Sequence, residues 1–481
     1  MLDRKTVFPS LRAAVFVSLA WFVVQLGAAQ GEEVPPREKR AAAPAPLRAG
    51  FASVDITPPT GTPSAGYGAR LGGGMRGVHD PLEADALVLA AGAKTLVLVG
   101  VDNLGFDSSM VGEIRAAARR VAGLEEAEIH VGSSHTHSGG GAHIAYPAAT
   151  ILFGIYDPER RRAYIDGTVR SIRDAAGRLQ PARLGIGYRE VVGLNRYRGK
   201  WPRKAPTNPW LTLIKVTGPA GEPMAALFVY AAHPTVLSGD YWLFSADFVG
   251  YARRAIASRI GGTRGAGSGL EGKPGGFGCV YFNGAQGDVS PRAPKEPPAE
   301  DGGEKRPAPA GEDEGKGAFA ACRRMGERLG DEVAALWKET ATRAEISIAT
   351  ESFPFTRPMR PSANGFTIAT GDHSSELNAI RIDGEHVFVT IPGELSAIYD
   401  ARIRDWAGWL GFRHATILGL TDDAMGYIIT PEAFRHRTYE STISFGGIDM
   451  GPFIEEKVLD LLHKLEPVEA SGGPKDAEAG R

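Results

Sequence analysis

Six short apolar segments, each with the composition of a β-strand, run directly into a loop that carries polar or ionisable side chains. The segments are Thr95–Val101, Glu128–Val131, Ala226–Ala232, Gly278–Phe282, His386–Ile391 and Thr416–Leu420. Short apolar runs of this kind predict buried strands. Because ligands collect at the carboxyl ends of strands in sheet enzymes, we expect the six loops to contribute to one site.

Helical patterns lie between and after these strands. They cover Ser108–Val121 (after the N-cap candidate Asp107), Tyr164–Leu179, Asp247–Arg259, Ala318–Glu339, Leu395–Leu410 and Pro452–Leu465. Strands and helices alternate only in part. The sequence therefore predicts an α/β fold with a β-sheet core, helices on its outer faces and an active site in loops at the carboxyl ends of strands.

The first residues have the pattern of an export signal. Three basic residues, Arg4, Lys5 and Arg12, precede an apolar run that ends at Leu26 and is followed by small residues. This pattern predicts a signal peptide at residues 1–29 and a secreted or periplasmic protein; an uncleaved anchor is the alternative. We further expect a disordered linker at 30–47, one folded domain at 48–466 and a disordered tail at 467–481.

Composition excludes one class of partner. The formal net charge of −2 over 481 residues gives no sign of the basic surface that nucleic-acid binding requires. A hydrophobic content of 43% is typical of a soluble globular protein with a substantial core. Two cysteines, Cys279 and Cys322, form no disulfide framework, and whether they pair stays open. The segments 261–276 and 293–315 are expected to be long surface loops.

The sharpest local signal is the pair His135 and His137 in a loop rich in Ser and Gly. Neutral imidazoles and a carboxylate are the usual ligands of a catalytic zinc, which keeps one position for water. In an extended backbone the two rings would share a face, so that one could bind metal while the other transfers protons. A surface pair without function is the alternative interpretation.

Five further positions carry suitable groups, and each has a structural alternative. His233 ends an apolar strand before Pro234 and is either a ligand or a core histidine with satisfied hydrogen bonds. Glu394 is either a ligand or a favourable acid at a helix N-terminus. Tyr427 and Tyr439 are either site residues or core aromatics. Ser290 is a nucleophile, a substrate-binding hydroxyl or part of a structural turn, and it lacks the Gly-x-Ser-x-Gly elbow of serine hydrolases.

An ordered set of motifs resembles one known family. The motifs are Ser134–Gly139, Ala232–Pro234, Gly287–Pro291, Pro392–Glu394 and Tyr427–Glu432, with Tyr439-Glu440 a little further on. From about Ala49 to Leu465 the chain resembles the N-terminal catalytic domain of the neutral, non-lysosomal ceramidases, without the C-terminal immunoglobulin-like domain of full-length members. The sequence departs from the family pattern at Gly140, Arg292 and Ala433-Phe434.

The resemblance implies roles for eight residues. It implies that His135, His233, Glu394 and Tyr427 bind one Zn²⁺. It implies that His137 and Arg196 line the reaction centre, that Ser290 takes part in catalysis or holds the substrate hydroxyl, and that Tyr439 stabilises the oxyanion.

The implied activity is hydrolysis of the amide bond of ceramide or a related N-acyl lipid. The alternatives are a zinc hydrolase of a different amide or ester, and a non-catalytic secreted binding module. A lipid substrate implies peripheral contact with a membrane surface and an apolar groove, for which 149–156 and 241–244 are the candidate walls. No obligate protein partner is evident.

Overall fold

The computed structural model describes residues 43–125, 128–261, 276–295, 317–367 and 371–467. Contacts divide the chain into Met1–Arg40, which lies outside the described residues, and Ala41–Arg481. The predicted signal peptide, most of the linker, the tail and most of both predicted surface loops also lie outside them. No described helix is long and apolar enough to cross a membrane.

Three mixed sheets form the centre of the described fold. The first contains β14 (Glu345–Ile346), β1 (Ala45–Asp55), β3 (Glu83–Ala91), β4 (Lys94–Val101) and β5 (Glu128–Ser133), with β6 (Gln180–Pro181) beside β1. The second contains β12 (Gly278–Asn283), β10 (Pro223–Tyr230), β9 (Trp210–Thr217) and β7 (Arg183–Glu190). The third contains β15 (Ile348–Pro358), β16 (Asp372–Ile382), β17 (His386–Thr390) and β19 (His414–Leu418).

Each of these sheets contains one parallel strand pair, and a helix connects the two strands of each pair. The β-helix-β units are β4–α1–β5, β10–α4–β12 and β17–α6–β19. Their helices are α1 (Ser108–Ala122), α4 (Phe248–Ile260) and α6 (Ala397–Trp409). A parallel pair needs such a crossover because both strands run in the same direction. The remaining pairings within the three sheets are antiparallel.

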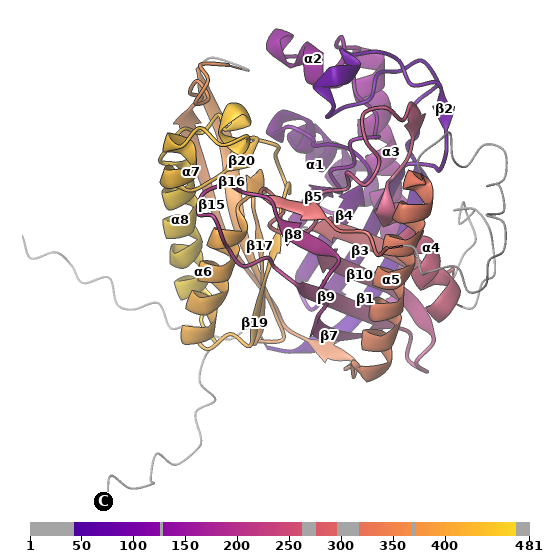
Figure 1. The fold of residues 1–481 in the computed structure, drawn as a ribbon. Coiled ribbons are helices and arrows are strands. Elements are labelled where there is room, and N and C mark those ends of the chain that lie inside the picture. Colours follow the sequence, from indigo (N-terminus) through magenta and orange to yellow (C-terminus); the bar gives the residue numbers. More distant parts are fainter. Residues whose placement is uncertain (1–42, 126–127, 262–275, 296–316, 368–370, 468–481) are drawn as a thin grey trace, which may run out of the picture. The chain divides into compact units, whose positions relative to one another are not determined.

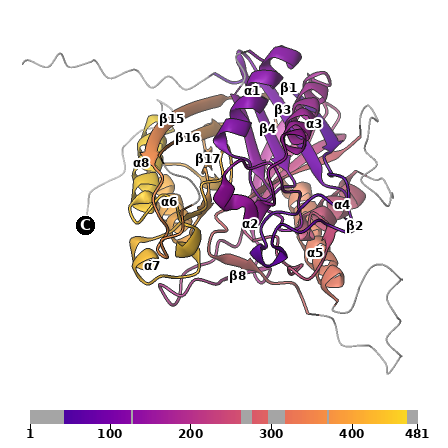
Figure 2. The ribbon, with the colours of Figure 1, turned by 90° about the horizontal axis from the view of Figure 1, so that it is seen from above.

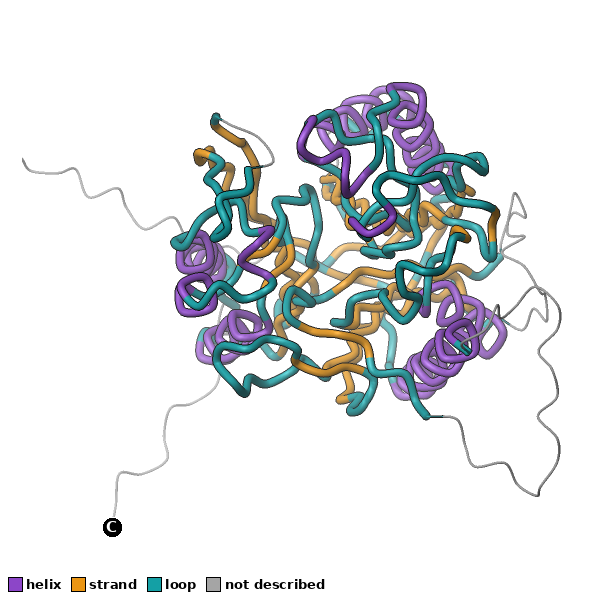
Figure 3. The backbone as a smooth tube through the Cα atoms, turned by 45° about the horizontal axis from the view of Figure 1, so that its top comes forward, coloured by secondary structure: helices purple, strands orange, loops and turns teal. Residues whose placement is uncertain are grey.

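The three sheets share one inner core, and helices cover their outer faces. Leu89, Val229 and Phe388, one from each sheet, belong to the same buried cluster. On the outer faces, α1 and α3 (Pro158–Ala176) pack on the first sheet, α4 and α5 (Ala318–Glu339) on the second, and α6 and α8 (Met450–Lys464) on the third. Figures 1 and 3 show the helices at the periphery and the strands inside. The predicted fold class is confirmed.

Short elements complete the described chain. They are η1 (Gly68–Arg70), β2 (Gly77–Val78), η2 (Pro147–Ala149), α2 (Thr150–Phe153), β8 (Asn195–Tyr197), β11 (Leu243–Phe244), β13 (Val289–Pro291), β18 (Glu394–Leu395), β20 (Tyr427–Ile428), α7 (Pro431–Arg435) and η3 (Glu440–Ile443). Cys279 and Cys322 are both buried free thiols.

The ends of two helices differ from the sequence prediction for a local reason. Helix α3 begins at Pro158, ahead of the predicted Tyr164, because the Asp157 side chain accepts a hydrogen bond from the Glu159 backbone N–H at 2.8 Å. Helix α6 begins at Ala397 and not at Leu395, because Ser396 is its N-cap. Glu394 and Leu395 instead pair with β20. Capping side chains, and not apolar periodicity, set both starts.

Protonation of the half-buried His414 gives the fold a testable pH dependence. Burial, with Arg404 and His386 nearby, lowers the pKa of His414 to about 4, while the unfolded value is about 6.5. The unfolded chain therefore takes up the proton first. The free energy of unfolding should fall as pH drops from about 6.5 to about 4, by about 1–3 kcal/mol for this group.

Urea unfolding at a series of pH values checks this expectation. His414→Gln should flatten the pH slope in that window. His463→Gln, at a side chain 62% exposed on α8, is the matched control and should leave the slope unchanged. Equal slopes for wild type and His414→Gln would contradict the assignment.

Candidate metal centre

The carboxyl ends of the three parallel strand pairs are tied together at Asn283, the last residue of β12. Its side-chain Nδ2 donates to the backbone carbonyls of Ser134 (3.0 Å) and Ala232 (3.1 Å), and its Oδ1 accepts from the Ala232 N–H. Its own carbonyl accepts from the Gly419 N–H at 2.8 Å. One fully buried residue thus joins the loops after β5, β10 and β19.

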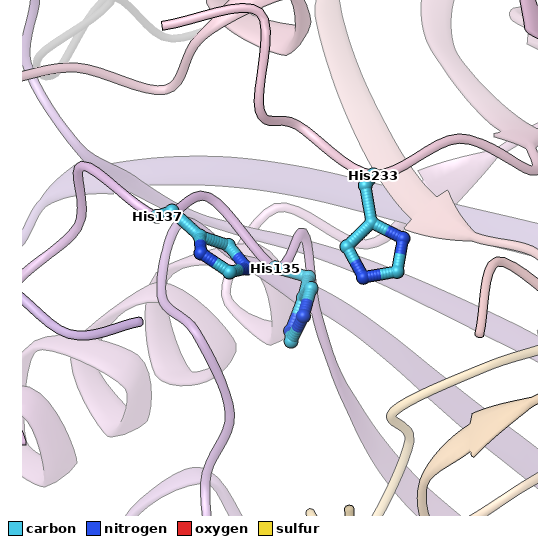
Figure 4. Close-up of side chains that lie close together, drawn as sticks. All are labelled: His135, His137 and His233. Carbon is cyan, nitrogen blue, oxygen red and sulfur yellow. The ribbon is translucent and has the colours of Figure 1, made fainter. Parts of the chain in front are cut away.

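Three imidazoles meet beside this junction. His135 and His137 lie in the loop after β5, and His233 follows β10. One ring nitrogen from each lies within 4.8 Å of the others. The ring centroids are 4.9 Å apart for His135–His137 and 5.0 Å for His135–His233. Figure 4 shows the three side chains turned toward one another.

Backbone carbonyls orient two of these rings toward Glu394. His135 Nδ1 donates to the Leu104 carbonyl at 2.7 Å, and His233 Nδ1 donates to the Val289 carbonyl at 3.1 Å. The Nε2 atoms then lie 3.3 Å and 3.0 Å from the same Glu394 Oε2. A bond from one ring nitrogen to a carbonyl fixes the tautomer, so each neutral ring turns a lone pair toward the carboxylate.

The pKa shifts favour these charge states. Burial, reinforced by Arg198, lowers the pKa of His233 to about 4. Burial alone would raise the pKa of Glu394, but His135 and His233 outweigh it and lower that pKa. At neutral pH His233 is therefore unprotonated and Glu394 is a carboxylate.

His137 completes the cluster without hydrogen-bond partners of its own. Both of its ring nitrogens are buried and unpaired among the described residues. Burial, followed by His135 and His233, lowers its pKa well below the usual value. A buried polar group without a partner is costly, so this ring is suited to bind a ligand or a reacting group.

The backbone at His135 differs from the expected extended segment. Its φ is 69°, in the left-handed region, and the turn is held by a hydrogen bond from the His135 N–H to the Asn103 carbonyl at 2.9 Å. A positive φ is uncommon for a residue with a Cβ and concentrates at functional sites. His135 and His137 still reach the same space, but through a turn and not through strand alternation.

Tyr427 lies against this group. Its strand β20 pairs in parallel with β18, so that Tyr427 is the register partner of Glu394. The Tyr427 ring is stacked on His233, with centroids 6.4 Å apart. The structure therefore brings together the four side chains for which the resemblance implies a metal.

Arg198 occupies the position beside the centre that the sequence led us to expect for Arg196. Its Nη2 donates to Tyr427 Oη at 3.0 Å and to the Gly287 carbonyl at 3.0 Å, and it lies 3.2 Å from His233 Nε2. Its Nε donates to Glu440 at 3.2 Å. Arg196 is exposed, and no hydrogen bond joins its side chain to the described residues of the centre. The one sequence feature that could have indicated Arg198 is that it is a second arginine two positions after Arg196.

Tyr439 and Ser290 are the two remaining residues for which the resemblance implies a role, and they lie in different parts of the structure. Tyr439 is 60% exposed, with its ring centroid 6.2 Å from that of Tyr427 and 5.8 Å from the Arg198 guanidinium carbon. Ser290 is half-buried in β13, directly after Val289, and its register partner across the two-stranded sheet is Arg196.

A pocket of about 590 Å³ of space, partly open to solvent, adjoins the centre. His135, His137, Glu394, Tyr427 and Tyr439 line one part of it. Its apolar lining consists chiefly of Leu104, Leu152, Phe153, Leu420, Ile443 and Phe445. Leu152 and Phe153 belong to the predicted wall 149–156, whereas none of the residues 241–244 contributes to the lining.

Three acids at strand ends serve the fold and lie outside the cluster. Asp102 pairs with the buried Arg253. Asp422 pairs with His130 at 2.7 Å and with Arg115 at 2.9 Å. Asp423 pairs with His373 at 2.6 Å. Each carboxylate already has a cationic or histidine partner, which a sequence alone does not reveal.

Comparisons with known proteins agree with the geometry. Residues 47–353, more than half of the chain, match the family described as neutral/alkaline non-lysosomal ceramidase, N-terminal. A neutral ceramidase of Pseudomonas aeruginosa is 29% identical over 222 residues, which are 43% of this chain and 33% of that protein. A neutral ceramidase of Mycobacterium tuberculosis is 26% identical over 248 residues, 46% of this chain and 37% of that protein. The chain thus spans about a third of the length of these relatives.

Solved structures show the same fold. The crystal structure of neutral ceramidase from Pseudomonas aeruginosa superposes with a TM-score of 0.72 at 20% identity, over 90% of this chain and 77% of that chain. A ceramidase complexed with C2 gives a TM-score of 0.70 at 19% identity, with the same coverage. By its sequence match over more than half its length, this chain belongs to the neutral/alkaline non-lysosomal ceramidase family, in the family's N-terminal region.

Proposed function

We propose that this protein is a zinc-dependent hydrolase that cleaves the amide bond of ceramide or a related N-acyl lipid. The products are a fatty acid and a sphingoid-type amine. The observation that carries the proposal is the meeting of two imidazole lone pairs and one carboxylate oxygen around a common point. Membership of the family and the names of its relatives support the substrate class.

The ligand atoms fit a small cation. Lone pairs of two neutral rings would repel a carboxylate at 3.0–3.3 Å unless a positive charge lies between them. The His135 and His233 Nε2 atoms and the Glu394 Oε2 atom are close enough together to share one zinc ion. The Tyr427 phenol would supply a further protein ligand, and one position would remain for water. Zinc, when bound, polarises the amide carbonyl and lowers the pKa of water to about 7.

His137 is suited to move the proton. Its ring is unprotonated at neutral pH, and neither nitrogen is engaged by another described residue. It can accept the proton of the attacking water at a ring nitrogen and then donate it to the leaving amine. Proton transfer of this kind contributes about 10²–10⁴-fold to rate.

Arg198 and Tyr439 supply positive charge and a hydroxyl donor beside the scissile bond. Nearby phenol and carboxylate groups, against the cost of burial, raise the pKa of Arg198, so it stays charged. It orients Tyr427 through the hydroxyl contact, and Tyr439 at the pocket edge can donate to the oxyanion. The apolar half of the pocket suits an acyl chain. Ser290 is not among the residues that line this pocket, and its part in catalysis or in holding the substrate hydroxyl stays a prediction from the resemblance. Export from the cell stays a prediction from the sequence.

Metal content tests the centre directly. The purified protein should hold one zinc per chain, and chelation should abolish amide hydrolysis until zinc is returned. Glu394→Ala should remove a charged ligand and with it most of the zinc, as measured by metal analysis. His373→Gln, a histidine outside the cluster, is the control and should retain the metal. Full activity after chelation would contradict the proposal.

Substrate class needs its own measurement. Release of fatty acid from a long-chain ceramide should exceed release from short soluble N-acyl amides under the same conditions, because the apolar pocket binds the acyl chain. A preference for short amides would favour the alternative hydrolase, and tight ligand binding without turnover would favour a binding module.

The two arginines provide a matched pair. Arg198→Gln should lower kcat by about 10²–10³-fold, because it removes the charge and the contacts to Tyr427 and His233. Arg196→Gln, at the exposed side chain two residues earlier, should change kcat by less than about 3-fold. Metal analysis of both variants shows whether the loss arises with the zinc in place. The reverse ranking would return the role to Arg196.

A further inference from the structure

Large apolar side chains are exposed at the rim of the pocket. Leu71 is 76% exposed, Ile155 77% and Ile151 49%. All three lie in or next to the short helices η1 and α2, which contact each other. In Figure 1, α2 lies at the top, beyond α1 and β5, and Figure 2 views the molecule from that end.

Backbone packing holds these side chains in one patch. Gly72 has a φ of +70°, and a Cβ there would lie 3.0 Å from Gly154 Cα and 3.3 Å from the Thr150 carbonyl oxygen. The adjacent residues Leu71, Ile151 and Ile155 therefore flank one tight contact. A further hydrogen bond, from the Gly66 N–H to the Leu152 carbonyl at 2.9 Å, fixes α2 against the loop before η1. We call Leu71, Ile151 and Ile155 the rim patch.

The rim patch is continuous with the apolar pocket. Within α2, Leu152 and Phe153 line the pocket, while the neighbouring Ile151 is exposed. The same short helix thus presents apolar side chains to the pocket and to the outside. Leu152 and Phe153 therefore join the rim patch, along the chain, to the pocket that His135 and His137 also line.

The charges around the patch suit a lipid surface. The segments 61–79 and 138–156, which carry η1 and α2, contain no Asp or Glu. Arg70 is buried and donates to backbone carbonyls, whereas Arg76 is exposed. The acids that follow these segments are Asp80, which is buried, and Asp157, which caps α3; Asp240 acts on the buried Arg70 from the neighbouring loop. Exposed apolar side chains on segments that carry an exposed cation and no acid of their own are typical of surfaces that insert into the headgroup region.

We propose that the rim patch docks this protein on the surface of a lipid bilayer, with Leu71, Ile151 and Ile155 inserted among the lipids and Arg76 at the level of the phosphates. Docking brings the mouth of the pocket to the layer in which an N-acyl lipid substrate resides. This inference rests on the proposed function for its substrate, but the docking itself can be measured without catalysis.

The test uses the full chain and a variant that carries Leu71→Ser, Ile151→Ser and Ile155→Ser. None of these residues lines the pocket. Val192→Ser, at an apolar residue 78% exposed elsewhere, is the matched control. Co-sedimentation with phosphatidylcholine vesicles, with and without phosphatidylglycerol, measures binding. Hydrolysis is measured on a short-chain soluble amide and on long-chain ceramide in the same vesicles.

We expect the triple variant to lose vesicle binding at least 10-fold, since each buried aliphatic side chain contributes about that factor. It should lose activity on vesicle ceramide in parallel and keep its kcat/KM for the soluble amide, while Val192→Ser matches wild type throughout. Arg76→Gln should weaken binding only to vesicles that contain phosphatidylglycerol.

Wild-type protein that fails to bind vesicles, or a triple variant that binds them as wild type does, would overturn the proposal. Vesicle binding that depends on the patch, in a protein that hydrolyses no amide, would support the docking surface and reject the proposed function. The experiment can therefore reject the docking surface and the proposed function independently of each other.

Discussion

The centre depends on the hydrogen bonds of one buried residue, Asn283, through both its amide side chain and its backbone carbonyl. Asn283 joins the loops after three strands, and each loop belongs to a different β-helix-β unit. An amide suits this position because its two N–H groups and its carbonyl can bond to backbone groups in different directions without a net charge. An unpaired backbone carbonyl at any of these places would cost about 1–3 kcal/mol. The positions of the imidazoles therefore depend on buried hydrogen bonds that give the backbone groups of these loops their partners.

Buried ion pairs around this junction keep other charges away from the candidate ligands. Asp422 in the loop after β19 is held by Arg115 and His130, and Asp102 directly after β4 is held by Arg253. Breaking such a pair usually costs about 3–5 kcal/mol because a charge is left buried and uncompensated. Acids with a cationic or histidine partner brace the loops, whereas Glu394 faces the rings of His135 and His233 and lies near the Arg198 guanidinium.

The sequence predicted the elements and the contacts between them only in part. The six strands expected to lead into site loops are all present because buried strands leave short apolar runs, and α5 was found with its observed bounds because its apolar period is regular. The sheet strands β3, β7, β9, β15 and β16 were not predicted. The arginine-rich start of α3 has no such period and was missed. Arg198 was missed because the resemblance pointed to Arg196, and only the packing of β8 against β13 shows which guanidinium reaches His233. The sequence could not reveal the left-handed φ of His135, because a residue other than glycine gives no sign of such a conformation.

The three β-helix-β units have a consequence for how the protein is made. His135, His233 and Glu394 each come from a different unit, so a partly folded chain in which one unit is undocked lacks at least one of these three candidate ligands. Contacts between segments so distant in sequence form late and slowly. A cation that binds only the completed arrangement cannot nucleate folding, but it slows unfolding and stabilises the finished protein by mass action. Metal uptake would then mark the end of maturation.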